Sequence, residues 1–111
     1  MTQAERDALN VEYVVVCKGW KATAISSLLY WTDAEGFLTA VVPDYLSDEA
    51  DAWRRIKALI DFGASPEFYI YDEKYCLMCR VSDEINPNFT DCGSPGEATL
   101  RACIALKVRV L

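Results

Sequence analysis

Residues 47–63 read SDEADAWRRIKALIDFG, and this stretch gives the strongest secondary-structure signal in the chain. Ser47 is a residue type that caps helix N-termini. Three acidic residues follow it within about one turn, where the dipole of a helix favours negative charge. Gly63 is the residue type at which helices commonly end. We therefore predict a helix that is capped by Ser47 and stops at Gly63.

The apolar residues of this helix recur at intervals of three and four, which places them on one face. Trp53, Ile56 and Ile60 form that stripe. We expect the stripe to pack in the core and the basic residues of the helix to point outward: Arg54, Arg55 and Lys57. Truncating Trp53 to alanine is then expected to cost about 3–5 kcal/mol.

A first helix is predicted over residues 3–17. Thr2 and Glu5 have the spacing of a capping box, in which the threonine oxygen accepts a hydrogen bond at the start of a helix. Apolar residues then follow at helical spacing. Gly19 lies where this helix should stop.

The segment after this helix is expected to form an irregular hairpin. The apolar residues within 22–31 have no clean period. Residues 33–36 read Asp-Ala-Glu-Gly, which is typical of a turn. Residues 37–42 are predicted to form a short strand that Pro43 closes.

Two further strands are predicted after Gly63. Residues 68–71 and 75–81 are rich in residue types that favour strands. Residues 72–74 are interpreted as a three-residue hairpin connection between them. The polar stretch 82–93 is predicted to be a loop.

The last helix is predicted from Ser94, because a serine cap, a proline and a glutamate three residues on form a strong start signal. The elements then run helix, hairpin, helix, strand, strand, helix. An α+β fold, with an antiparallel sheet of three to four strands covered by three helices, satisfies this order. The 111 residues suit a single domain, residues 1–111.

The composition argues against catalysis and against direct nucleic-acid binding. The chain has no histidine, so the commonest general base and metal ligand is missing. Its formal net charge of −6 disfavours contact with nucleic-acid phosphates. We expect no enzymatic activity, no cofactor and no metal.

The five cysteines are interpreted as free, buried thiols of a reducing cytoplasm. Cys76 and Cys79 have Cys-x-x-Cys spacing but lie in a predicted strand, where residues three apart point to opposite faces. The chain has no apolar run of roughly 20 residues and no signal-peptide pattern. The expected location is a cytoplasm.

Several short motifs resemble the phage ABA sandwich domain family and, more distantly, the NinX-like phage proteins. The motifs are GWK at 19–21, WTDAEG at 31–36, VPDYLSD at 42–48 and EATLRACIALK at 97–107. Leu46, between Tyr45 and Ser47, departs from the family pattern. The resemblance implies a three-layer α/β/α sandwich and a phage or prophage origin, with location in the host bacterial cytoplasm. It implies no activity.

These observations favour a phage accessory protein that inhibits a host protein, in the manner of an anti-CRISPR protein. An acidic surface would occupy a basic partner surface, such as a nucleic-acid channel of a defence complex. The candidate contacts are Asp33, Glu35, Asp44, Tyr45, Asp48, Glu49, Asp72, Glu73, Asp83 and Glu84. Two alternatives remain: modulation of host replication or recombination, and sequestration of a nucleotide signal. The basic residues open to such a ligand are Lys18, Lys21, Arg54, Arg55, Lys57, Arg80 and Arg101. Enzymatic activity is the least favoured of these functions.

Overall fold

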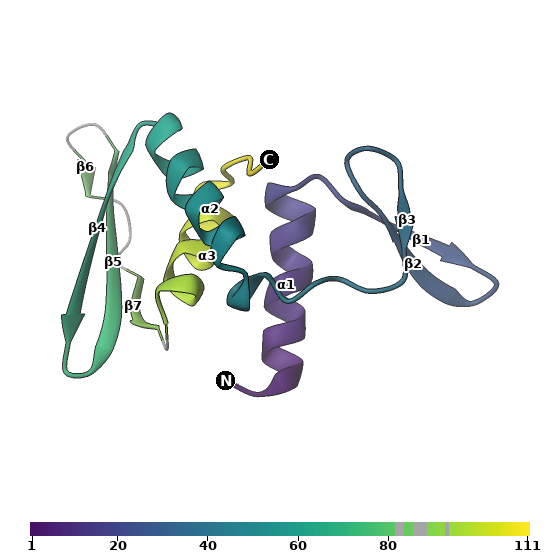
Figure 1. Ribbon diagram of the computed structural model, residues 1–111, viewed down its shortest axis with the longest axis horizontal. Helices are drawn as coiled ribbons and strands as arrows, with labels where there is room; N and C mark the ends of the chain where they lie inside the picture. The colour runs from purple at the N-terminus through teal and green to yellow at the C-terminus, as the bar shows by residue number, and fades with distance from the viewer. Residues whose placement is uncertain (82–83, 86–88, 93) are drawn as a thin grey trace.

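The computed structural model describes residues 1–81, 84–85, 89–92 and 94–111. These residues form three α-helices and two antiparallel sheets, which confirms the predicted α+β class. Along the long axis in Figure 1, the sheet of β4–β7 is followed by helices α2 and α3, then by helix α1, and then by the sheet of β1–β3. The molecule measures 48 × 29 × 21 Å, which is elongated for its size.

Helix α1 spans Gln3–Cys17, as the sequence predicts. The Thr2 side chain accepts a hydrogen bond from the Glu5 backbone N–H, and this confirms the predicted cap. Gly19 has a φ of +70°, a backbone conformation that glycine adopts readily. The chain therefore leaves the helix at Gly19 and turns toward Trp20, whose N–H donates to the Val14 carbonyl.

The segment expected to be an irregular hairpin is a three-stranded meander, which we call the arm. It consists of β1 (Lys21–Ile25), β2 (Leu28–Thr32) and β3 (Leu38–Thr39). The predicted turn at 33–36 is confirmed by a hydrogen bond from the Gly36 N–H to the Asp33 carbonyl. Among the described residues, the arm strands pack mainly against one another and not against the helices.

Helix α2 spans Glu49–Asp61 and follows a short 3₁₀ helix, η1, at Tyr45–Ser47. The predicted cap residue is wrong: the Asp48 side chain, not Ser47, accepts the hydrogen bond from the Asp51 N–H. Ser47 is taken up by η1, and this shifts the start of the helix by one residue.

The predicted orientation of α2 is also wrong. Trp53 is 72% exposed and Ile60 is 55% exposed, whereas Asp51, Arg55 and Leu59 are the buried residues of the helix. These three recur at intervals of four and define the inward face. Trp53 is two residues from Asp51, so the two side chains point to roughly opposite sides and cannot both face the core.

The second sheet contains β4 (Ala64–Tyr71), β5 (Lys74–Val81), β6 (Glu84–Ile85) and β7 (Phe89–Cys92), with β4 on one side of β5 and β6 and β7 on the other. The β4–β5 connection has two residues, Asp72 and Glu73, rather than the three predicted. Both have positive φ, as in a type I′ turn. Two short strands lie within the predicted loop 82–93.

Helix α3 (Pro95–Leu106) packs between the second sheet and α1. Its predicted start is confirmed, because the Ser94 hydroxyl accepts a hydrogen bond from the Glu97 N–H. The core gathers around this helix, where Leu59, Leu77, Leu100 and Cys103 are fully buried. The chain end then runs back to α1, and the Val110 N–H donates to the Cys17 carbonyl.

Gly96, in the first turn of α3, is required by a close backbone approach. A Cβ at this position would lie 2.5 Å from the carbonyl oxygen of Leu46. Gly96→Ala is therefore expected to lower the free energy of unfolding by about 1–3 kcal/mol, as overpacking does. Intrinsic helix propensity alone would raise it by up to about 1 kcal/mol. Urea denaturation distinguishes the two signs, and a gain in stability would show that η1 and α3 are not in contact.

Candidate functional site

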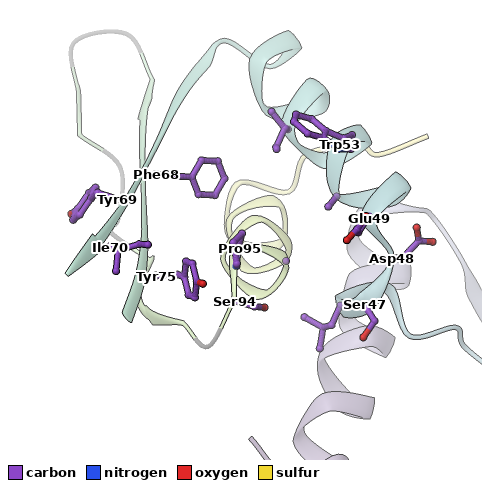
Figure 2. Close-up of a pocket in the computed structure, with 14 residues that line it drawn as sticks. Ser47, Asp48, Glu49, Trp53, Phe68, Tyr69, Ile70, Tyr75, Ser94 and Pro95 are labelled. Carbon is purple, nitrogen blue, oxygen red and sulfur yellow. The ribbon is translucent and has the colours of Figure 1, made fainter. Parts of the chain in front are cut away.

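A large concave surface lies between α2 and the β4–β5 hairpin. This surface, which we call the α2–β4 groove, has a volume of about 980 Å³ and is also lined by the start of α3. Figure 2 shows Trp53 on α2 and Phe68 and Tyr75 on the hairpin flanking the same space, with Pro95 between them. Tyr69 also borders the groove, but its ring points away from it in Figure 2.

The groove is apolar along most of its length and acidic at one end. Trp53, Phe68 and Ile70 are all exposed, so the groove presents large apolar side chains to solvent. Asp48 and Glu49 lie at its acidic end, in the first turn of α2. Among the described residues that line the groove, none carries a positive charge. This surface suits an occupant with apolar side chains and a nearby cation.

A buried ionic network explains why α2 turns Trp53 outward. The Asp51 carboxylate accepts hydrogen bonds from Tyr13 Oη and Arg55 Nη1, each at 2.6 Å, and Lys18 Nζ lies 2.8 Å from its other oxygen. Asp51 and Arg55 are both fully buried. Exposing Trp53 allows these charges to meet the partners that neutralise them.

The remaining donors of Arg55 are also satisfied. The guanidinium donates to the Thr99 hydroxyl at 3.0 Å and to the carbonyls of Tyr45 and Gly96 at 3.1 and 3.3 Å. Arg55 therefore joins α2 to η1 and α3. A guanidinium held in this way has no donor directed at a ligand, so its role is structural.

Burial and the contacts within the network determine the protonation states of Asp51 and Tyr13. Burial by itself raises the pKa of Asp51, but the hydrogen bonds from Lys18 and Tyr13 outweigh it and bring the pKa below its ordinary value. Burial and the neighbouring Asp51 raise the pKa of Tyr13 far above its ordinary value. The carboxylate is thus ionised and the phenol neutral at pH 7. Neither group is poised for proton transfer near neutral pH.

The structure places the predicted contact residues in separate regions. Asp48 and Glu49 line the α2–β4 groove. Asp33, Glu35 and Tyr45 line a smaller cavity of about 290 Å³ near the base of the arm. Asp72 and Glu73 are exposed at the tip of the β4–β5 hairpin. They do not form one acidic face.

Besides Asp48, which caps α2, three of these predicted residues have structural contacts. Asp44 accepts hydrogen bonds from Arg6 at 2.8 Å and from Asn10 at 3.1 Å, which fastens the chain before η1 to α1. The Arg6 hydrogen bond also lowers the pKa of Asp44. Asp33 Oδ1 accepts from the backbone N–H groups of Glu35 and Phe37 and so shapes its own turn. The half-buried ring of Tyr45 packs edge-on against Tyr13.

The remaining two predicted residues are Glu84 and Asp83. Glu84 lies in β6, where it pairs with Val81. Asp83 lies outside the described residues. The sequence did not predict the aromatic half of the groove, because Trp53 was expected to pack in the core.

Three of the cysteines have described side chains. Cys17, Cys76 and Cys103 are buried thiols, as expected for these three. Burial raises the pKa of the Cys17 thiol to about 12, so it stays protonated. In the part of the chain that the structure describes, no three His, Cys, Asp or Glu residues are grouped to hold a metal ion. No described helix is long and apolar enough to span a bilayer.

Positively charged residues border another cavity, which is smaller than the α2–β4 groove. It has a volume of about 520 Å³ and is bordered by Arg54 and Lys57 of α2 and by Arg109 near the chain end. Phe62 and Leu111 contribute apolar surface, and Asp61 contributes one negative charge. Sequence reasoning named Arg54 and Lys57 as candidates for an anionic ligand but missed Arg109, which only the fold brings near them.

The chain matches no family model, no curated protein and no solved structure. The candidate site is therefore interpreted from its geometry and chemistry alone.

Proposed function

We propose that this protein acts by binding another protein, without a chemical step of its own, and that the α2–β4 groove receives a segment of the partner. The observation that carries this proposal is the exposure of Trp53, Phe68 and Ile70 around one groove. A soluble domain exposes such side chains together mainly where a partner covers them.

The composition of the groove indicates the chemistry of the partner segment. Tryptophan and tyrosine are the residue types that most often dominate binding energy at protein interfaces. Asp48 and Glu49 at one end favour a basic residue on the partner, and the net charge of −6 steers a basic partner toward the molecule. We therefore propose an amphipathic segment with apolar anchors and a flanking lysine or arginine.

For the biological role, we propose a phage or prophage accessory protein that inhibits a host protein in the bacterial cytoplasm. The acidic charge and the resemblance of the motifs at 19–21, 31–36, 42–48 and 97–107 support this role. A host defence complex with a basic nucleic-acid channel is the target class that fits best. The inhibitor would compete for that channel by charge and by the apolar anchors of the groove.

Replacing Trp53 by alanine tests the groove. The variant is expected to lose at least tenfold in affinity for a basic amphipathic peptide of alternating Leu and Lys blocks, because an aromatic anchor is removed. Its free energy of unfolding should change by less than about 1 kcal/mol, since the side chain is 72% exposed. Isothermal titration calorimetry and urea denaturation measure the two quantities.

Ile60→Ala provides the matched control. Ile60 is also an exposed apolar residue of α2, but it does not line the groove. Ile60→Ala should leave binding of the Leu/Lys peptide unchanged. A peptide with Glu in place of Lys should bind neither the wild type nor the variants. Equal losses for both variants, or wild-type affinity for the Leu/Glu peptide, would show that the groove is not the binding site. Pull-downs from bacterial extract with the same pair of variants then isolate the natural partner.

The basic cavity supports a second candidate function, sequestration of an anionic nucleotide signal. Arg54, Lys57 and Arg109 could neutralise phosphate while Phe62 contacts a base. A thermal shift assay with cyclic nucleotides tests this function, because a bound ligand raises the melting temperature. A shift that persists in Arg109→Ala would place the ligand elsewhere, and no shift would exclude the nucleotides tested.

A further inference from the structure

The chain exposes more surface than a compact monomer of its size. Its accessible surface is 7009 Å². A compact monomer of 12.5 kDa exposes about 6,200 Å². The excess of about 800 Å² is similar to the area that each partner buries in a standard protein interface. The arm is set apart from the helices in Figure 1, and every residue of β1 is exposed.

None of the described helices packs as a layer on the arm, although the sequence of the arm provides an apolar face. The β1–β2 register pairs Ala22 with Trp31 and Ala24 with Leu29, so these four residues share one face of the meander. Thr39, paired with Trp31, joins the same face. Leu29 is 57% exposed. No residue of this face, which we call the alanine face, carries a charge.

The opposite face of the meander is mixed in character. It carries the side chains of Lys21, Thr23, Ile25, Leu28, Tyr30, Thr32 and, on β3, Leu38. Thr23 and Thr32 lie with their hydroxyl oxygens 3.4 Å apart. Packing this face against another sheet would bury a lysine and two hydroxyl groups. The alanine face can be buried at a lower cost, because apolar side chains lose no hydrogen bonds to water.

We propose that the arm is a dimerisation element, in which the alanine faces of two copies of this chain pack against each other. Small isolated sheets are marginally stable in water and gain stability when an apolar face is covered. Two sheets packed face to face provide that cover for both copies.

The alanine face is self-complementary, as a two-fold interface requires. Its small residues, Ala22 and Ala24, lie on β1, and its large residues, Leu29 and Trp31, lie on β2. Two copies related by a two-fold axis can therefore set the large residues of each arm over the small residues of the other. Because this interface is remote from the α2–β4 groove, the dimer leaves the proposed partner site open.

Sedimentation equilibrium or light scattering on the full chain tests the dimer. At concentrations of tens of micromolar, the wild type is expected at twice its 12.5 kDa monomer mass. Leu29→Lys should shift the mass to that of the monomer, because it places a charge at the centre of the interface. Leu28→Lys is the matched control: Leu28 is 59% exposed on the adjacent position of the same strand but on the opposite face. It should remain a dimer.

The outcomes distinguish the alternatives. A wild type that stays monomeric at these concentrations would overturn the proposal. Dissociation by Leu28→Lys and not by Leu29→Lys would overturn the choice of face. Dissociation by Trp53→Ala, with Leu29→Lys still dimeric, would place the interface in the groove instead.

Far-ultraviolet circular dichroism checks that the three helices are intact in each variant. A Leu29→Lys chain that unfolds is replaced by Leu29→Ser, which should weaken the dimer measurably.

Discussion

Arg55→Ala is expected to lower the free energy of unfolding by about 3–5 kcal/mol, because it removes one of the two counterions of the buried Asp51 carboxylate and leaves only Lys18. The guanidinium is fully buried and contacts Asp51, Thr99 and the carbonyl groups of Tyr45 and Gly96. Alanine removes every one of these contacts. It also leaves the Thr99 hydroxyl and two carbonyl oxygens without this donor in the core. Urea denaturation at pH 7 measures the loss.

Arg54→Ala is the matched control for this experiment. Arg54 is the preceding residue of the same helix and is exposed. Surface substitutions of this kind change stability by about 0.5 kcal/mol or less. A loss at Arg55 as small as the loss at Arg54 would mean that α2 is rotated about its axis relative to the structure, with Arg55 in solvent. The comparison therefore tests the orientation of α2 directly.

Local sequence signals located the helices of this protein well. Thr2 with Glu5 and Ser94 with Glu97 are side-chain caps whose bonding partners lie within three residues. Such contacts depend on neighbours in the chain, so sequence alone is enough to place them. The turn at residues 33–36 is local in the same sense. These features could be predicted because no distant part of the chain decides them.

The orientation of α2 could not be predicted in this way. The sequence shows one arginine beside another, and only the fold decides which is buried. Arg55 lies inside because Tyr13, Lys18 and Thr99, from two other helices, surround the Asp51–Arg55 pair. If every charged residue of α2 is assumed to be exposed, the apolar stripe that contains Trp53 is assigned to the core. The α2–β4 groove was missed for the same reason.

The predicted contact residues illustrate what composition can and cannot show. The count of acidic residues is a property of the sequence, but their grouping is not. Asp44 is bound to Arg6 and Asn10, while Asp48 and Glu49 remain at the end of the groove. These distinctions depend on residues far away in the chain. Charge alone therefore predicted a class of partner, and the fold is needed to propose where that partner binds.

Asp51→Asn is expected to lower the free energy of unfolding at pH 7 by about 3–5 kcal/mol, because it removes the negative charge that Arg55 and Lys18 share. It should also change the dependence of stability on pH. The pKa of Asp51 is lower in the folded state than in the unfolded chain, where an aspartate titrates near about 3.9. As the pH falls below this value, protons bind the unfolded chain first.

The stability that Asp51 provides is therefore complete above the unfolded pKa and is lost as the pH falls through the folded pKa. The wild-type and Asp51→Asn proteins should differ most near pH 7 and approach each other as the pH falls below about 4. Urea denaturation at a series of pH values measures both curves. Asp61→Asn, at the exposed end of α2, is the control and should match the wild type at pH 7. Two curves that stay parallel down to pH 2 would show that Asp51 is not ionised in the folded protein, and the ionic network would then need a different description.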